Sequence, residues 1–202
     1  MARRKKLTKN KTTSPLTWIE ATKTIDYLRK KKAYPELLII AVGCYTGYRL
    51  VDLLKLKYSD FDGDRITVIA NKTGKPRTVP IFSRIKKIVE ECRKGLKKRK
   101  DNYLFTRTRF VSNVPISRMS ALTWIKKGFK IAGVEREMLS GHTLRKTYAL
   151  RKFEGLKDKI GEYRALNEIA KDLRHDSVKA TRTYLSIPQS ELEEINASMF
   201  DD

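Results

Sequence analysis

Four residues in the second half of the sequence form two short patterns that suit phosphate chemistry. His142 and Arg145 are the ends of the segment His-Thr-Leu-Arg, and His175 lies nine residues before Tyr184. The sequence has only these two histidines in 202 residues, and each of them lies in a pattern with an arginine or a tyrosine. Cations can hold the charged oxygens of a phosphodiester while a phenol attacks its phosphorus. These residues therefore predict cleavage of a nucleic-acid strand.

Two further patterns occur earlier in the sequence. Arg49 follows Thr-Gly-Tyr, and Asp52 comes three residues later, a spacing at which a carboxylate on a helix can orient the guanidinium. Residues 72–75, Lys-Thr-Gly-Lys, have the composition of a hairpin tip and supply Lys72. On a helix, His142 and Arg145 would project from one face, one turn apart.

The surrounding sequence predicts mostly helices, with one hairpin. Thr17 and Glu20 have the spacing of a capping box at the start of a helix, and Pro35 opens a second helix that residues 43–47 interrupt. Residues 65–69 and 77–81 are rich in β-branched side chains and flank the predicted tip. Further helices are expected at residues 50–56, 83–97, 117–132, 143–154, 163–173, 177–184 and 189–199. The prediction is a single, mainly α domain with a small antiparallel β-sheet.

The composition favours a polyanionic partner. The net charge is +22 and the pI is about 10.0, and lysine or arginine bound to phosphates releases condensed counterions. We expect double-stranded DNA as the partner and no membrane, since no run of about 18 apolar residues occurs. Cys44 and Cys92 are too few and too far apart for a disulfide framework or a metal site, which predicts a reduced, cytoplasmic protein.

The distribution of charged and apolar residues divides the chain into three predicted parts. Residues 1–13 hold six Lys/Arg and no acid, which predicts a flexible basic arm. Residues 14–186 hold all the patterns above and form the predicted catalytic domain. Residues 187–202 carry an apolar stripe on a piece too short to be stable alone, made of Leu192, Ile195, Met199 and Phe200.

Taken in order, these residues resemble the tyrosine recombinases, the phage integrases and DNA invertases that cut DNA through a phosphotyrosine. That family has an arginine after Thr-Gly-any, a lysine on a β-hairpin, His-x-x-Arg, a second histidine, and then the nucleophilic tyrosine. The residues that fill these positions here are Arg49, Lys72, His142, Arg145, His175 and Tyr184. The resemblance runs from about residue 16 to residue 185 and implies the integrase catalytic-domain fold.

The resemblance and phosphoryl chemistry together imply a role for each residue. Arg49 and Arg145 would each donate hydrogen bonds to the non-bridging oxygens, whose charge grows in the transition state. His142 and His175 would add hydrogen bonds there, and His142 could accept the proton of Tyr184. Surrounding cations would favour the ionised phenol, whose ordinary pKa is about 10.

The leaving oxygen and the cofactor requirement complete this scheme. Lys72, on its hairpin, would protonate the departing 5′-oxygen. The covalent 3′-phosphotyrosine would store the energy of the broken bond, so no cofactor is expected. No carboxylate cluster suggests a two-metal site, and we expect cleavage without metal.

Three departures from the family pattern stand out. Arg174 precedes His175 where the family usually has glycine, which alters the turn that presents His175. Lys146 stands where histidine is common. His175 lies 30 residues after Arg145, several more than usual, and we expect the excess in a polar connection at residues 155–162.

The resemblance also implies assembly. Most members carry a further N-terminal domain that clamps DNA, and short single-domain invertases do not. We expect a homo-tetramer on two paired sites, with residues 187–202 packed in cis or exchanged between protomers. Two other functions stay open: a type IB topoisomerase, which relaxes DNA as a monomer, and a relative that regulates DNA without cutting it. The sequence does not specify the target site or the outcome of recombination.

Overall fold

The computed structural model describes residues 13–71, 74–107, 113–136 and 138–188. The predicted basic arm up to residue 12, Lys72 and the predicted helix at 189–199 lie outside the described residues. Helices dominate the described part, with one two-stranded sheet. In chain order the elements are α1 (Trp18–Lys30), α2 (Tyr34–Thr46), α3 (Leu50–Leu53), the 3-10 helix η1 (Tyr58–Phe61), β1 (Arg65–Ile69), β2 (Pro76–Pro80), α4 (Ser83–Gly95), α5 (Arg118–Ile131), α6 (Gly141–Ile160), α7 (Glu162–Leu173) and α8 (Val178–Leu185).

The predicted capping box at the start of α1 is confirmed. The Thr17 hydroxyl accepts the Glu20 N–H at 3.2 Å, and the Glu20 carboxylate accepts the Thr17 N–H at 2.8 Å. These contacts satisfy two of the backbone donors that a helix start leaves unpaired. The cap thus fixes where α1 begins.

Pro35 lies in the first turn of helix α2, as predicted, but the helix is not interrupted at Gly43. A Cβ at Gly43 would lie 2.6 Å from a side-chain carbon of Leu144, so the glycine allows α6 to approach α2 closely. The helix ends instead at Gly47, whose φ of 61° is left-handed. A glycine inside a helix costs little when close packing compensates for it.

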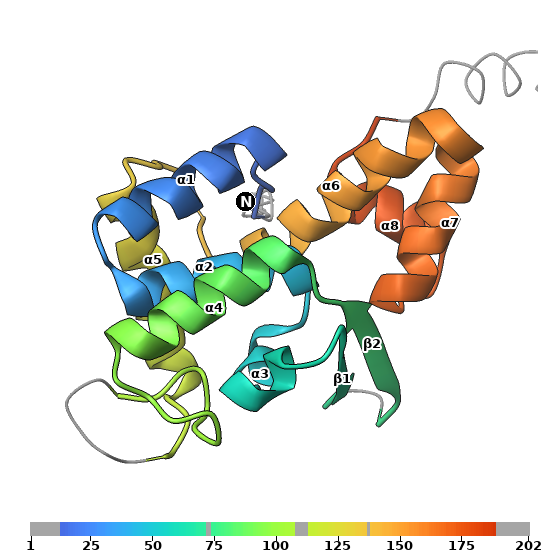
Figure 1. Cartoon of the computed structure of the whole chain (residues 1–202). Helices are drawn as coiled ribbons and strands as arrows, with labels where there is room; N and C mark the ends of the chain where they lie inside the picture. The colour runs from blue at the N-terminus through green and yellow to red at the C-terminus, as the bar shows by residue number, and fades with distance from the viewer. Residues whose placement is uncertain (1–12, 72–73, 108–112, 137, 189–202) are drawn as a thin grey trace, which may run out of the picture.

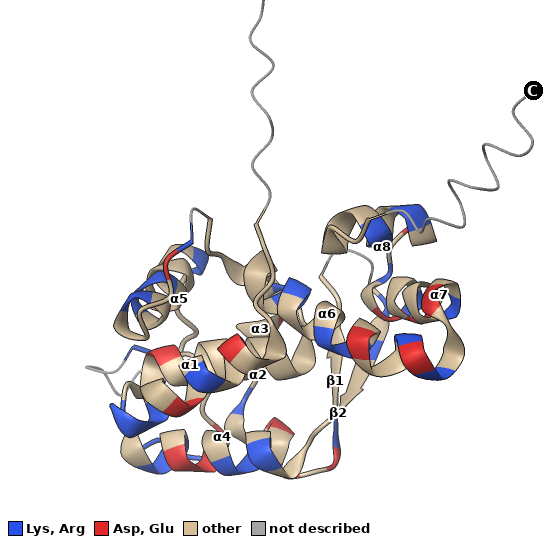
Figure 2. Cartoon of the chain, turned by 90° about the horizontal axis from the view of Figure 1, so that it is seen from above, with Lys and Arg blue, Asp and Glu red and all other residues tan. Residues whose placement is uncertain are grey.

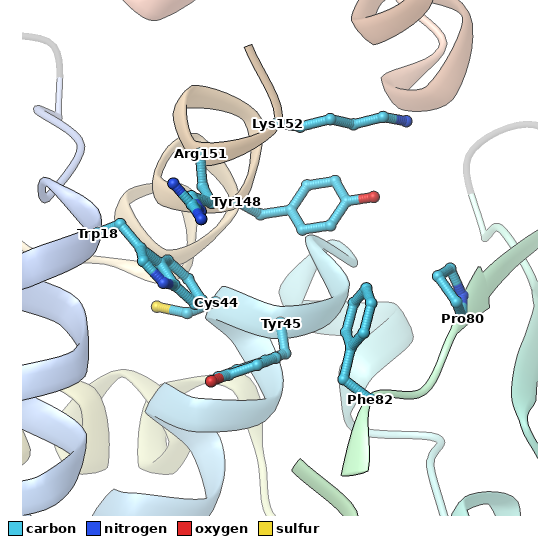
Figure 3. Close-up of a pocket in the computed structure, with 8 residues that line it drawn as sticks. All are labelled: Trp18, Cys44, Tyr45, Pro80, Phe82, Tyr148, Arg151 and Lys152. Carbon is cyan, nitrogen blue, oxygen red and sulfur yellow. The ribbon is translucent and has the colours of Figure 1, made fainter. Parts of the chain in front are cut away.

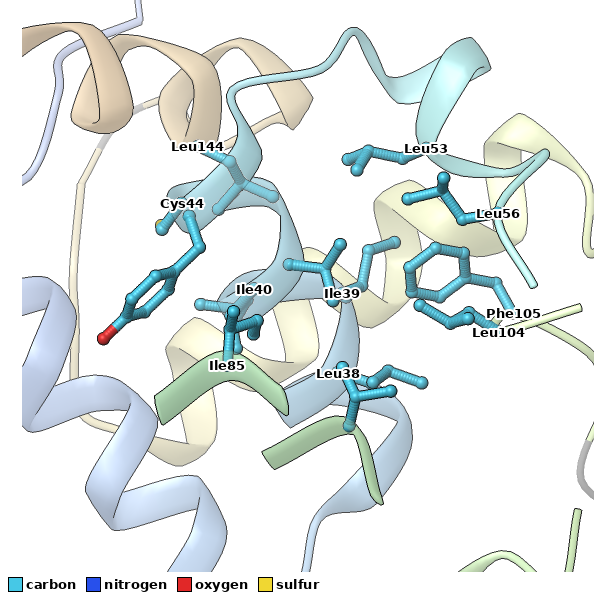
Figure 4. Close-up of a cluster of buried hydrophobic side chains, with 14 of the residues drawn as sticks. Leu38, Ile39, Ile40, Cys44, Leu53, Leu56, Ile85, Leu104, Phe105 and Leu144 are labelled. Carbon is cyan, nitrogen blue, oxygen red and sulfur yellow. The ribbon is translucent and has the colours of Figure 1, made fainter. Parts of the chain in front are cut away.

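Helix α2 is the centre of the larger hydrophobic core. Its side chains are buried all round, with α1, α4 and α5 packed about it (Figure 1). Leu38, Ile39 and Ile40 of α2 lie among side chains from distant parts of the sequence, including Phe105 and Leu144 (Figure 4). A helix that is apolar on every side can be stable only in such a position.

Helix α6 connects this core to a second, smaller one. Leu144, near its start, belongs to the first core, whereas Ala149 and Phe153 pack with α7 and α8 in the second. Figure 1 shows α6 running from the α1–α2–α4–α5 cluster to the α7–α8 cluster. The predicted connection at 155–162 is wrong, because α6 continues to Ile160 and only Gly161, at φ 81°, separates it from α7. Residues 155–160 include good helix formers and no proline, so Gly155 alone does not end α6.

The two strands form the predicted antiparallel hairpin. Arg65 pairs with Pro80 and Ile69 with Pro76, and residues on each strand alternate between exposed and buried. One face of the hairpin is therefore inside, as the period of two requires. The expected mainly α fold with a small antiparallel sheet is confirmed.

Charged residues are distributed unevenly over the helices. Acidic and basic residues are mixed on α1, α4 and α7 (Figure 2), whereas α5 and α8 contain basic residues and no acid. None of the helices in the described part is long and apolar enough to cross a membrane.

Two glycine substitutions test the arrangement of α6. Gly43→Ala should lower the free energy of unfolding by about 1–3 kcal/mol, because the new methyl group overlaps Leu144. Gly155→Ala should raise it by about 0.5–1 kcal/mol, because Gly155 is exposed within α6 and a Cβ there meets nothing within 4 Å. Urea denaturation measures both changes. A destabilising Gly155→Ala would contradict the helical path of α6.

Candidate active site

The end of α2 presents Arg49. Gly47 adopts its left-handed conformation against the ring of Tyr148, and a Cβ there would lie 2.3 Å from the ring. Only glycine fits both constraints. Arg49 then forms the N-cap of α3 in an extended conformation and is partly buried. Its side chain lines a cavity of about 330 Å³ together with Arg118, His142 and Arg145.

Arg145 is a deeply buried cation in the lining of this cavity. It is 4 % exposed and donates hydrogen bonds to the carbonyls of Gly47 at 2.6 Å and Leu173 at 2.7 Å. Burial and the nearby charge of Arg77 lower its pKa to about 10, so it stays charged at neutral pH. Arg145 therefore joins the end of α2 to the end of α7 while keeping its positive charge in the cavity.

Arg77, which the sequence analysis missed, joins the same two helix ends. It is 7 % exposed, and its Nε donates to the Asp172 carboxylate at 3.0 Å while its Nη1 donates to the Thr46 carbonyl at 2.8 Å. The rings of Tyr48 and Tyr148 lie 4.9 and 5.4 Å from the guanidinium carbon. The signal was present in the sequence, because the alternation in β2 places Arg77 on the same face as buried residues.

Asp52 does not orient Arg49 as predicted. Its carboxylate accepts the backbone N–H of Asn71 at 2.9 Å, and no ion pair with Arg49 occurs in the described structure. The reason is geometric: Arg49 is extended at the N-cap, so the helical spacing assumed from the sequence does not apply. Asp52 instead binds the backbone of Asn71, the residue just before Lys72. Lys72 lies outside the described residues.

The two histidines come from different elements, and both lie near the charge of Arg145. His142 is on the first turn of α6, where the Ser140 hydroxyl accepts its backbone N–H at 3.1 Å. His175 follows α7, and its Nδ1 lies 3.1 Å from the Thr181 hydroxyl. Burial, with the charge of Arg145, lowers the pKa of both rings, for His175 to about 4. Both are therefore neutral at pH 7 in this structure.

Tyr184 lies against His175, with ring centroids 4.8 Å apart in an edge-on arrangement. Its hydroxyl is buried, makes no hydrogen bond of normal length and angle among the described residues, and lies close to the Arg145 guanidinium. Burial raises the pKa of Tyr184, and the charges of Arg145 and Arg49 only partly oppose this rise. The surrounding cations thus favour the phenolate, as expected, but desolvation of the phenol is the larger effect and leaves the pKa of Tyr184 raised in the protein without DNA.

Lys146, which stands where the family commonly has histidine, also contacts the tyrosine. It is 4 % exposed, and its Nζ lies 4.9 Å from the centre of the Tyr184 ring. Burial lowers its pKa. Lys146, His142 and Tyr184 together line a second cavity of about 730 Å³.

Five of the six predicted residues therefore converge. Arg49, His142 and Arg145 share one cavity, His142 and Tyr184 share the other, and His175 contacts Tyr184. An aromatic cleft of about 400 Å³ between α1, α2 and α6 contains none of the predicted residues (Figure 3). It is lined by Trp18, Cys44, Tyr45, Pro80, Phe82, Tyr148, Arg151 and Lys152.

The profile of the phage integrase family matches residues 16–190, nearly the whole chain. The chain belongs to the phage integrase family. Among curated members it is similar to the probable integrase/recombinase YoeC of Bacillus subtilis, with 26 % identity over 176 residues, which cover 87 % of this chain and 90 % of YoeC. It is 28 % identical over 184 residues to tyrosine recombinase XerA of Pyrococcus furiosus, covering 89 % of this chain and 59 % of XerA.

Solved structures of the family share the fold. A crystal structure of XerA recombinase has a TM-score of 0.67 at 26 % identity, covering 94 % of this chain and 66 % of that chain. XerH recombinase in a post-cleavage complex with its difH substrate has a TM-score of 0.67 at 21 % identity, covering 93 % of this chain and 54 % of XerH. The fold is thus that of a tyrosine recombinase catalytic domain, as expected.

Asp172 is the acidic partner on which the buried Arg77 depends. The carboxylate also accepts the Tyr148 hydroxyl at 2.8 Å and the Lys152 ammonium at 2.7 Å. Asp172→Ala should lower the free energy of unfolding by about 3–5 kcal/mol, because it leaves Arg77 buried without an anion. Glu168→Ala, which removes an exposed carboxylate from the same helix, should change it by less than about 0.5 kcal/mol. Equal effects of the two substitutions in chemical denaturation would contradict the importance of the Arg77–Asp172 pair.

The lowered pKa of His175 predicts loss of stability in acid. The folded protein keeps this ring neutral down to about pH 4, whereas the unfolded chain binds its proton from about pH 6.5 downward. The unfolded state therefore binds more protons in this window, and stability falls as the pH falls through it. Replacing His175 with Phe should make the slope of unfolding free energy shallower by up to about 1.4 kcal/mol per pH unit. Urea titrations at several pH values measure the slopes, and identical slopes for the wild type and the variant would contradict the lowered pKa of His175.

Proposed function

We propose that the chain is a site-specific recombinase that cleaves and rejoins double-stranded DNA through a covalent 3′-phosphotyrosine on Tyr184. The observation that carries the proposal is the arrangement around Tyr184: its buried hydroxyl lies near two arginine charges, and His175 packs on its ring. Membership of the phage integrase family supports the reaction class.

The arginines are proposed to bind the scissile phosphate. Arg145 uses two N–H groups on the Gly47 and Leu173 carbonyls, which fixes the guanidinium in place before DNA arrives. Arg49 lines the same cavity. Donors that are already oriented toward the growing charge lower the barrier without reorganising during the reaction.

The proton transfers follow from the neutral histidines. In the proposed step the Tyr184 oxygen forms a bond to phosphorus as the bond to the 5′-oxygen breaks. His142, on the wall of the cavity that it shares with Tyr184, accepts the phenol proton, and His175 binds the phosphate. Lys72 gives a proton to the 5′-oxygen. Entry of a phosphate also brings negative charge that Arg49 and Arg145 can pair with.

The assembly is proposed to be a homo-tetramer on two paired DNA sites. Lambda integrase, which shares the fold at 19–22 % identity, has been solved as a dimer on a core site and as a tetramer on a Holliday junction. Residues 189–202 of this chain contain five acids and no base, in a chain of net charge +22. We propose that the apolar, acidic segment at 187–202 contacts a neighbouring protomer rather than DNA.

A covalent-adduct assay tests the nucleophile. The protein is incubated in EDTA with duplex DNA from its own genomic neighbourhood, and denaturing gels are examined for a protein–DNA band. We expect the band with the wild type and with Tyr163→Phe, since Tyr163 is exposed on α7. Tyr184→Phe keeps the ring but has no nucleophilic oxygen, and it should give no band. An adduct with Tyr184→Phe would remove Tyr184 from this role.

The same DNA separates the alternative functions. Exchange of strands that requires two copies of the site indicates a recombinase, whereas relaxation of a supercoiled plasmid with a single site indicates a topoisomerase. Tight binding without any adduct indicates a regulator that does not cut.

A further inference from the structure

The turn between α7 and His175 has an unfavourable backbone conformation. Arg174 adopts φ 56° and ψ 56°, the left-handed region that glycine enters easily and that other residues rarely adopt. The backbone N–H of His175 donates to the Ala170 carbonyl at 2.9 Å, which closes the end of α7. A glycine would form this turn with less strain, so any benefit of arginine must come from its side chain.

The Arg174 side chain reaches the β1–β2 hairpin, almost a hundred residues away in sequence. Its Nη1 donates to the Lys75 carbonyl at 2.9 Å, and its Nη2 donates to the Pro76 carbonyl. These carbonyls are consecutive and lie where the chain leaves the hairpin turn and enters β2. A planar guanidinium can bridge two such oxygens, which a lysine ammonium does less well.

The opposite side of the same turn is held by Asp52. Its carboxylate accepts the Asn71 N–H, where the chain leaves β1 and enters the turn. The base of the hairpin turn is thus fixed from α3 on one side and from the end of α7 on the other. All the atoms of these two contacts belong to described residues.

We propose that Arg174 is a positioning residue that fastens the base of the hairpin to the turn carrying His175. This inference rests on the proposed function, in which the hairpin supplies the proton for the 5′-oxygen. The bridge sets the distance between the hairpin and the phosphate cavity, so departure of the 5′-oxygen depends on it. Binding of DNA and attack by Tyr184 depend on other residues.

The test uses Arg174→Gly, which relieves the backbone strain and removes the bridge. Single-turnover formation of the covalent adduct is measured on a nicked duplex containing the cleaved site, with either oxygen or sulfur as the bridging 5′-atom. A 5′-thiolate departs without a proton. On the oxygen substrate the variant should be slower than the wild type by about 10–100-fold. On the sulfur substrate it should react at the wild-type rate, and its melting temperature should equal or exceed that of the wild type.

Arg174→Lys and Arg164→Ala serve as controls. Arg174→Lys retains the charge without the two-pronged bridge and should show an intermediate defect on oxygen. Arg164→Ala removes an exposed charge from the same helix and should react normally. A normal rate for Arg174→Gly on oxygen would overturn the inference, as would an equal defect on both substrates. A wild type that forms no adduct on either substrate would instead refute the proposed function, and the inference with it.

Discussion

The structure depends on two buried arginines that bind the same pair of helix ends. Arg145 holds the carbonyls of Gly47 and Leu173, and Arg77 holds the carbonyl of Thr46 and the carboxylate of Asp172. Thr46 and Gly47 are neighbours at the end of α2, and Asp172 and Leu173 are neighbours at the end of α7. Each arginine binds one residue of each pair. Arg49 lies two residues after Gly47, and His175 lies two residues after Leu173. The hydrogen bonds that stabilise the fold therefore also set the distance between these side chains.

This arrangement concentrates positive charge that the protein itself only partly neutralises. Arg145 has a lowered pKa because it is buried beside Arg77, and Asp172 is the acid that compensates. Lys146, also buried, packs on the Tyr184 ring. The phenol is protonated in this state because burial outweighs the cations. A bound phosphodiester would supply the anion that the cavity lacks, so the free energy of binding includes relief of repulsion among the arginines.

Local patterns in the sequence predicted most of the fold, and the errors occurred where distant packing decides the outcome. The capping box at Thr17, the hairpin strands and the helix order follow from neighbouring residues. The continuity of α2 through Gly43 depends on Leu144, about a hundred residues away, and the partner of Asp52 depends on where the hairpin folds back. The convergence of Arg49, His142, Arg145, His175 and Tyr184 was expected from family spacing, while their roles stay predictions. Arg77 was missed, and the contact of Lys146 with Tyr184 was not predicted, because a buried cation looks like a surface cation in a sequence with 45 lysines and arginines.

The position of α6 in both hydrophobic cores has a consequence for folding. Leu144 completes the core around α2, and two turns later Phe153 completes the core with α7 and α8. Neither core is complete unless α6 is formed, and a helix of 20 residues is not stable in water without packing against other elements. The two clusters must therefore gain and lose their structure together. The chain is one cooperative folding unit whose cores are linked by one helix, and the arginines between the cores become ordered only when both clusters have folded.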